Sequence, residues 1–121
     1  MLLVRTVALF FLCTAAASAA DVVLTCPITI TKGTSQFSIQ RRFEINFDSM
    51  SVAQYINQGS GWDSESTLTL SVADNDKYEF SGAGVAKSYI DRHTGEYYQE
   101  DGRGIARGTC HKAGGDKQVL F

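Results

Sequence analysis

The stretch FSIQRRFEINF, residues 37–47, decides which fold this chain can adopt. Its apolar residues stand at every second position, so one face of an extended strand would carry Phe37, Ile39, Phe43, Ile45 and Phe47. A helix repeats every ~3.6 residues and would scatter these residues around its circumference, whereas a strand repeats every two. The stretch therefore predicts a β-strand with one buried face.

Arg41 is the exception in this stretch, because it falls on the apolar face. Two interpretations are open. In the first, a bulge, a bend or a barrel rim lets the guanidinium reach water. In the second, Arg41 is an interior arginine that takes an anionic ligand or a carboxylate partner, since an unpaired buried charge is too unfavourable to persist. Arg41 is therefore a candidate binding residue.

The same alternation recurs along the rest of the chain. In VVLTCPITIT (22–31), Pro27 cannot donate a ladder hydrogen bond, which predicts that this strand lies at an edge or carries a bulge. Residues 49–57 fit either a short strand or a single helical turn, and 57–66 is expected to be a Gly/Ser loop. Further strands are expected at 67–73, 77–82, 85–91, 96–101 and 105–111, with 117–121 as a candidate for a last one. The prediction is an all-β fold: a small antiparallel barrel or sandwich of about 7–8 strands.

The first twenty residues are expected to be a signal peptide. Arg5 supplies a positive charge, an apolar run follows from Val7, and small residues from Ala15 to Ala20 offer a cleavage site just before Asp21. The apolar run is too short to span a bilayer, so no membrane span is expected. Residues 21–121 would then form a single β-rich domain that is periplasmic or secreted.

Two cysteines, Cys26 and Cys110, remain after the signal peptide. An exported domain with two cysteines most simply pairs them. A reactive or metal-bound thiol pair beside His111 is the alternative, but the spacing does not match a zinc site. One disulfide between Cys26 and Cys110 is predicted, and no metal.

Charge and motifs exclude several classes of function. The formal net charge is −2 and no basic stripe is present, so nucleic-acid binding is not expected. No phosphate loop, dinucleotide fingerprint or nucleophile elbow occurs in the sequence. We therefore expect no cofactor, no catalytic residues and no enzymatic activity.

The stretch YIDRHTGEYY (89–98) groups side chains that could take part in catalysis or binding. Asp91 and His93 could act as an acid–base pair, but Arg92 would point to the opposite face of a strand. A hairpin turn explains the stretch as well, because Asp91 can accept backbone hydrogen bonds and Gly95 can adopt positive φ. The turn is favoured, which leaves Arg92 and His93 as candidate exposed contacts.

Trp62 lies in the middle of the expected Gly/Ser loop. It could fold back as a plug over one end of the core, which a small barrel needs. It could also be a binding residue, because loops on rigid β scaffolds carry function and tryptophan is a common interface anchor. Trp62 is retained as a candidate binding residue.

The motifs I-D-R-x-T-G at Ile90–Gly95 and G-T-C at Gly108–Cys110 resemble those of small, uncharacterised exported β-rich proteins of proteobacteria. This resemblance implies a periplasmic location and the Cys26–Cys110 pairing, and it transfers no catalytic residues. A looser similarity links the chain to the periplasmic C-type lysozyme inhibitors. Their S-G-x-x-Y loop is incomplete here, since no tyrosine follows Ser81 and Gly82, and the lysine of their K-G-x-x-A stretch is absent before Gly104.

The favoured function is that of an exported, non-enzymatic binding or interaction domain. Its partner would be an unknown protein or a small-molecule ligand. The alternatives are a lysozyme-inhibitor-like protein and a small-ligand carrier that uses the barrel interior and Arg41.

Overall fold

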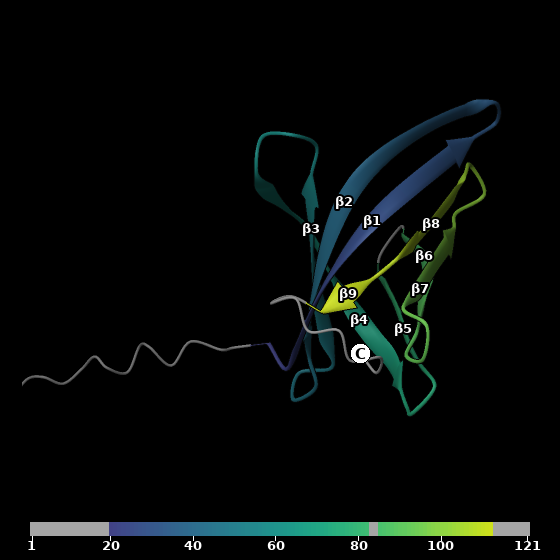
Figure 1. Ribbon diagram of the computed structural model, residues 1–121. Coiled ribbons are helices and arrows are strands. Elements are labelled where there is room, and N and C mark those ends of the chain that lie inside the picture. Colours follow the sequence, from purple (N-terminus) through teal and green to yellow (C-terminus); the bar gives the residue numbers. More distant parts are fainter. Residues whose placement is uncertain (1–19, 83–84, 113–121) are drawn as a thin grey trace, which may run out of the picture.

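The computed structural model describes residues 20–82 and 85–112, and all of their regular structure is β (Figure 1). The strands are β1 (Val22–Lys32), β2 (Ser35–Asn46), β3 (Ser51–Asn57), β4 (Trp62–Ala73), β5 (Lys77–Gly82), β6 (Val85–Asp91), β7 (Glu96–Glu100), β8 (Ile105–Thr109) and β9 (His111–Lys112). Most of the expected signal peptide and the candidate strand at 117–121 lie outside the described residues.

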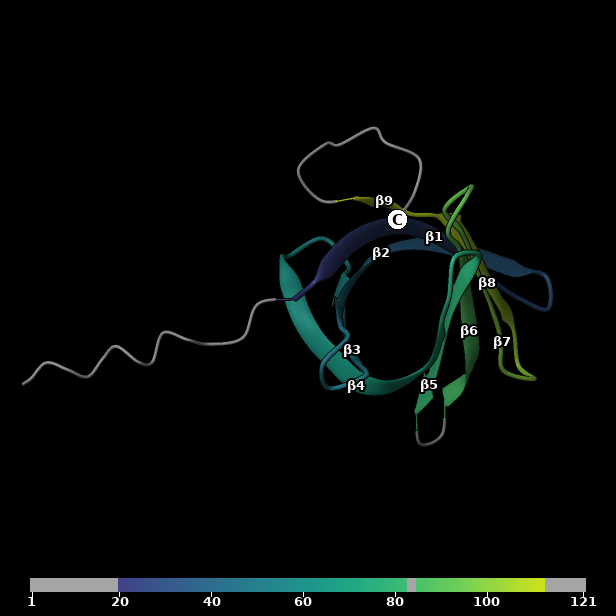
Figure 2. The ribbon, with the colours of Figure 1, turned by 90° about the horizontal axis from the view of Figure 1, so that it is seen from below.

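The strands form a closed antiparallel barrel. Each strand from β1 to β7 pairs with the next one along the chain, and β8 pairs with β1 to complete the ring. Figure 2 shows this ring, with β9 added as a short extra strand on β1. The predicted all-β fold is confirmed, and of the two expected architectures it is the barrel that forms.

The barrel closes at the seam between β8 and β1. β8 pairs with β1 from Ile28 to Thr31, and β9 pairs with β1 at Leu24 and Thr25. The register is the same on both sides of the gap, so Cys110 stands opposite Cys26 there. The two cysteines form a disulfide, with their Cα atoms 4.1 Å apart, and both are fully buried. The predicted disulfide is confirmed.

Pro27 lies beside this gap, and β1 is not an edge strand, because it pairs with both β2 and β8. The edge prediction for Pro27 was therefore wrong. The register between β1 and β2 runs from Val22 to Lys32 without a shift, so β1 has no bulge toward β2 either. The interruption between the β8 and β9 pairings falls where the proline has no N–H to donate.

The barrel interior is filled by the inward faces of the alternating strands. Phe43 packs against Phe80 and Tyr97, with ring centroids 5.1 Å and 5.3 Å apart. The apolar face predicted for 37–47 supplies Ile39, Phe43 and Ile45 to this core, while Phe37 and Phe47 at its ends are exposed. The other buried hydrophobic residues are Leu24, Cys26, Ile28, Val52, Leu68, Leu70, Tyr78, Phe80, Ile90, Tyr97, Ala106 and Cys110.

The structure decides between the two alternatives for one segment and corrects the expected length of another. The ambiguous segment 49–57 is a strand from Ser51 onward, not a helical turn. The expected loop 57–66 is shorter than predicted, because β4 already begins at Trp62. Pairing with β3 holds residues 62–66 extended despite their polar composition.

The barrel has two distinct ends (Figure 1). The end that carries the β1–β2, β3–β4 and β7–β8 connections is called the upper end. The lower end carries the β2–β3, β4–β5 and β6–β7 connections. Candidate residues from the sequence lie at both ends.

We expect loss of the disulfide to lower the free energy of unfolding by about 4–5 kcal/mol, because the bond closes a loop across most of the chain. The test is urea denaturation of the Cys26→Ala/Cys110→Ala variant against the oxidised protein. Adding a reductant should lower the free energy of unfolding of the oxidised protein and leave that of the double variant unchanged. A loss below ~1 kcal/mol would contradict the role of the bond as the main fastening of the seam.

Candidate functional site

Arg41 points into the barrel near the upper end and is bound to a carboxylate. Its Nε lies 3.2 Å from Oε1 of Glu65, and its Nη2 donates to Oε2 at 3.4 Å. Its Nη1 donates to the hydroxyl of Tyr97 at 3.4 Å, and only 11% of the side chain is exposed. β2 has no register shift at Arg41, so no bulge is present there. Arg41 lies at the rim of the barrel, where it borders the open hollows, and it has the carboxylate partner that the second interpretation required.

Glu65 reaches Arg41 because of a β-bulge in β4. Ser66 pairs with Gln54 and Ser64 pairs with Tyr55, which leaves Glu65 as the extra residue between them. A bulge turns a side chain away from the face that strict alternation would give it. The carboxylate of Glu65 also accepts a hydrogen bond from Nε2 of Gln54, at 2.7 Å.

Polar groups continue below this ion pair into the core. Tyr97 is almost fully buried, and burial raises the pKa of its phenol, although the charge of Arg41 acts in the opposite direction. The Oε1 of Gln54 is buried and has no hydrogen-bond partner among the described residues. The Oγ of Ser88 is also buried, and it interacts with the hydroxyl of Tyr97 and helps to lower the pKa of that phenol. A buried polar atom without a partner is unfavourable, typically by 1–3 kcal/mol as an order of magnitude, and is a reason to look for a bound molecule or water.

Two hollows open beside these groups at the upper end. The larger has a volume of about 270 Å³, and Arg41, Gln54 and Glu65 belong to its wall. The smaller has a volume of about 110 Å³ and is lined in part by Lys32 and Ile30. Both hollows share three residues, Arg41, Gln99 and Asp101. We refer to the two hollows together as the upper mouth.

The lower end contains the stretch 89–98, which forms the predicted turn between β6 and β7. The Asp91 carboxylate accepts hydrogen bonds from the backbone N–H of His93 at 2.7 Å and of Thr94 at 3.1 Å. Gly95 has φ of +83° and donates its N–H to the carbonyl of Asp91 at 2.8 Å. The hydrogen bond from His93, followed by that from Thr94, holds the pKa of Asp91 below its usual value.

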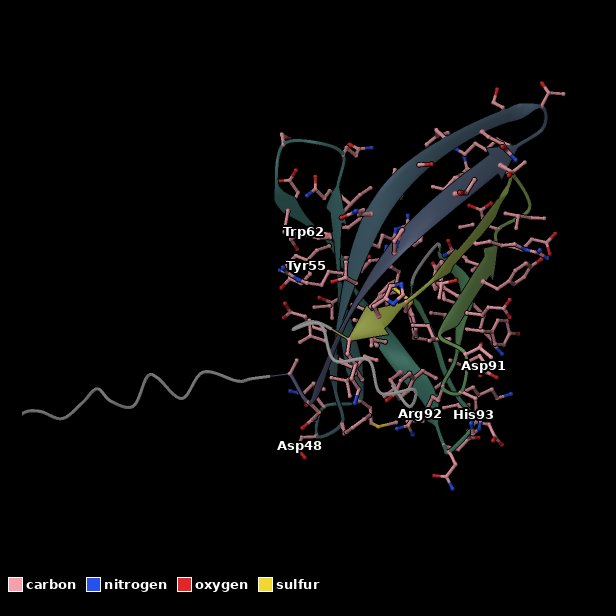
Figure 3. All side chains as sticks on the ribbon, viewed as in Figure 1. Asp48, Tyr55, Trp62, Asp91, Arg92 and His93 are labelled. Carbon is pink, nitrogen blue, oxygen red and sulfur yellow. A yellow bond between two sulfur atoms is a disulfide. The ribbon has the colours of Figure 1, made fainter. Side chains whose placement is uncertain are left out.

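Arg92 and His93 fasten this turn to the neighbouring β4–β5 turn (Figure 3). The Nη1 of Arg92 donates to the carbonyl of Asp74 at 2.6 Å, and its guanidinium lies 4.7 Å from the ring centroid of Tyr78. The Nε2 of His93 lies 3.1 Å from Oδ1 of Asp76. Both candidate contact residues thus have partners inside the chain, and neither lies near Arg41 in the fold.

Trp62 does not cover the end of the core. It begins β4 and stacks against Arg42, whose guanidinium lies 5.0 Å from the Trp62 ring and 4.6 Å from the Tyr55 ring. Arg42 follows Arg41 in β2 and therefore points to the outer face of the barrel. Figure 3 shows Tyr55 and Trp62 together, far from Asp91, Arg92 and His93.

Within residues 20–82 and 85–112, no three His, Cys, Asp or Glu side chains are grouped closely enough to hold a metal ion. The same residues contain no helix with the length and hydrophobicity needed to cross a membrane. Comparison with known protein families, curated proteins and solved structures gives no significant match. The incomplete inhibitor-type loop begins at Ser81 and runs into residues 83–84, outside the described part of the chain.

Sequence reasoning found Arg41 but missed the residues that surround it. Glu65 stood in an expected loop, Gln54 in an ambiguous segment, and Tyr97 in the strand expected at 96–101, where nothing linked it to Arg41. The only available signal was the need for a charge partner, because a buried arginine requires one. Nothing in the sequence says which of the chain's carboxylates supplies it.

We expect the stability that depends on Asp91 to be lost in acid. The pKa of Asp91 is lower in the folded protein than its unfolded value of ~3.9, so ionised Asp91 stabilises the fold above that pH. The contribution disappears as the pH falls through the folded pKa. Asp91→Ala should therefore destabilise the protein at neutral pH and have less effect near pH ~2.

The measurement is thermal unfolding of the wild type, Asp91→Ala and Asp91→Asn across this pH range. Asp91→Asn keeps an acceptor for the turn and serves as the control that removes only the charge. A destabilisation by Asp91→Ala that is equally large in acid would contradict the role of the ionised carboxylate.

We expect the Arg41–Glu65 pair to contribute a coupling free energy of about 1–2 kcal/mol, because only 11% of the Arg41 side chain is exposed, although Glu65 is 30% exposed. A double-mutant cycle with Arg41→Met and Glu65→Gln, measured by urea denaturation, gives this quantity. The pair Arg42→Met and Glu44→Gln on the outer face is the matched control, since its Nε–Oε2 distance is also 3.2 Å. The two carboxylates are about equally exposed, whereas Arg42 is 27% exposed, so equal coupling in both cycles would contradict the effect of burying the arginine.

Proposed function

We propose that this chain is an exported, non-enzymatic domain that binds a small polar ligand at the upper mouth of its barrel. The observation that carries the proposal is the buried Oε1 of Gln54, which has no hydrogen-bond partner among the described residues and belongs to the wall of the larger hollow. A bound ligand with a donor group would satisfy this atom.

The size of the hollow favours a small ligand. Pockets for drug-sized molecules have volumes of roughly 300–1,000 Å³, and the larger hollow has about 270 Å³. The core below it is filled by packed side chains such as Phe43 and Tyr97. This arrangement supports a ligand held at the mouth more than one carried deep inside the barrel.

The charges around the mouth favour a ligand without net charge. Arg41 and Lys32 are balanced by Glu65 and Asp101. The backbone N–H of Arg103 mainly lowers the pKa of Asp101, and the charge of Lys32 adds a smaller effect in the same direction. Carboxylate, amide and guanidinium groups together can bind hydroxyl and amide groups. The ligand class that fits is a neutral molecule rich in hydroxyl or amide groups, of about the size of one sugar ring.

Two further features support export and a role without catalysis. A disulfide such as Cys26–Cys110 persists in oxidising compartments, in agreement with the signal-peptide pattern of residues 1–20. The acid and base of the stretch 89–98 are engaged in turn contacts: Asp91 accepts backbone hydrogen bonds, and His93 contacts Asp76. The side chains most suited to acid–base chemistry are therefore used for structure.

We expect N-acetylglucosamine, which carries both hydroxyl and amide groups, to shift the NMR signals of Gln54, Gln99 and their neighbours at micromolar to millimolar concentrations. Gln54→Leu removes the amide at similar size and should weaken binding at least about tenfold, because a bound ligand loses a hydrogen bond. Trp62→Leu, on the outer face, is the control and should bind as the wild type does. The proposal fails if a panel of neutral sugars and amides shifts no signal at the upper mouth.

A further inference from the structure

One edge of β2 is unpaired although the barrel is closed. β3 pairs with β2 only from Gln40 to Asn46, whereas β1 pairs with β2 as far as Ser35. Above Gln40, the β1–β2 hairpin and β3 separate, as Figure 1 shows. Residues 35–39 of β2 thus have a strand on one side and, among the described residues, none on the other.

The backbone groups on this free side can be assigned from the hairpin. Gly33, with φ of +59°, and Thr34 form a two-residue turn, and Lys32 pairs with Ser35 across it. Residues that flank such a turn form a hydrogen-bonded pair, so alternate residues of β2 from Ser35 onward direct their N–H and C=O groups to β1. Gln36 and Ser38 direct theirs to the side that β3 does not reach.

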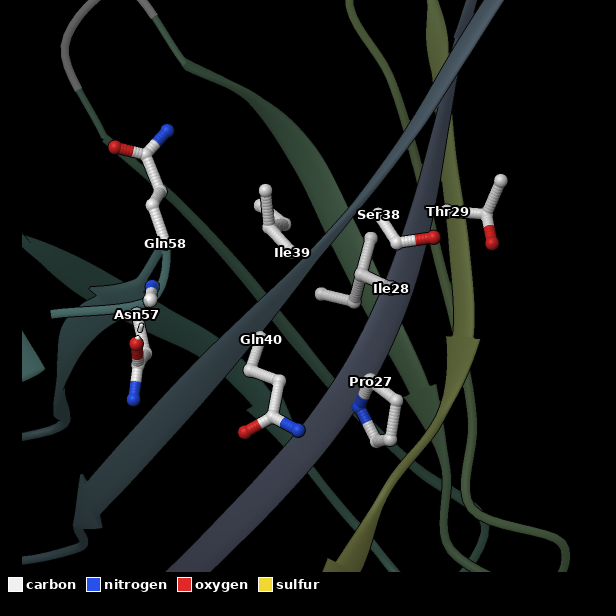
Figure 4. A pocket seen from close by; sticks show the side chains of 9 residues that line it. Pro27, Ile28, Thr29, Ser38, Ile39, Gln40, Asn57 and Gln58 are labelled. Atoms are coloured by element: carbon white, nitrogen blue, oxygen red, sulfur yellow. Dashed lines mark hydrogen bonds between the residues drawn. The ribbon is translucent and has the colours of Figure 1, made fainter. Parts of the chain in front are cut away.

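A hollow of about 490 Å³ lies against this edge (Figure 4). Ser38, Ile39 and Gln40 form one wall, and Asn57 and Gln58 at the end of β3 form another. None of the described residues that line it carries a charge. The edge segment 35–39, SQFSI, is also uncharged and contains no proline, although exposed edges of soluble proteins are normally protected by such residues.

We infer that this edge is an interface between two copies of the chain, which pair through β2 about a two-fold axis. An antiparallel register centred on Phe37 lets Gln36 of each copy exchange backbone hydrogen bonds with Ser38 of the other. These are the two residues whose backbone groups point away from β1 and have no pairing strand among the described residues. The pairing covers residues 35–39 and stops before Gln40, which already pairs with Asn57.

The same register explains the exposure of Phe37. Its side chain is 44% exposed, and the Lys32 ammonium lies 5.8 Å from its ring centroid. In the proposed register, the two Phe37 residues stand directly opposite each other at a position where strands approach most closely. The rings would bury each other, and cross-strand aromatic pairs stabilise antiparallel sheets. No charge on the edge segment opposes the contact.

The test is sedimentation velocity of the purified protein from micromolar to millimolar concentration. We expect a concentration-dependent dimer. Ser38→Pro removes an N–H that has no ladder partner among the described residues, so the monomer should stay folded while dimerisation weakens at least about tenfold. Ser38→Ala keeps the N–H and is the matched control, expected to dimerise like the wild type.

Two further measurements keep the test decisive if Ser38→Pro perturbs folding. Phe37→Lys places two like charges opposite each other and should also prevent the dimer. In the wild type, amide hydrogen exchange at Gln36 and Ser38 should slow as the concentration rises. A protein that stays monomeric at millimolar concentration, or a dimer that Phe37→Lys and Ser38→Pro leave intact, overturns the inference.

Discussion

The seam between β1 and β8 is the constraint on which the rest of the structure depends. β1 and β2 form an uninterrupted ladder, but the ladder that closes the ring is broken at Cys26 and Pro27. Proline removes a donor at this point, so hydrogen bonds alone hold the seam weakly. The disulfide joins the two strands across the break, and a covalent bond replaces the missing part of the ladder. Without closure, β1 and β8 would both present open edges.

Unequal strand lengths then give the upper end its shape. β1 and β2 are long, whereas β3, β7 and β8 are short. The β1–β2 hairpin therefore extends beyond its neighbours and leaves the segment 35–39 without a partner on one side. Arg41 and Asp101 line the hollows between these unequal strand ends. Both the ligand site and the interface that we propose follow from this mismatch.

The sequence predicted those features of the fold that depend on local alternation. Phe43 and Ile45 are buried as the period of two requires, and Asp91 and Gly95 form the expected turn. Features that depend on which strands lie side by side were not predicted, or were predicted wrongly. A proline usually indicates an edge strand, but β1 has neighbours on both sides, and the ladder beside Pro27 is interrupted instead. The bulge at Glu65 changes which face the side chains of β4 occupy, and its polar surroundings resemble a loop until β3 is placed beside it.

The two ends of the barrel differ in how far the chain satisfies its own polar groups. At the lower end, Asp91 accepts backbone hydrogen bonds, Arg92 binds the carbonyl of Asp74, and His93 contacts Asp76. At the upper end, Gln54 buries a carbonyl oxygen that has no partner in the described part of the chain, and residues 35–39 of β2 offer backbone groups to no strand there. Unsatisfied polar groups are unfavourable for folding, and a second molecule that supplies the missing partners removes that penalty. The stretch richest in acid and base side chains therefore maintains the fold, while binding is expected at the end where the chain's own hydrogen bonds are incomplete.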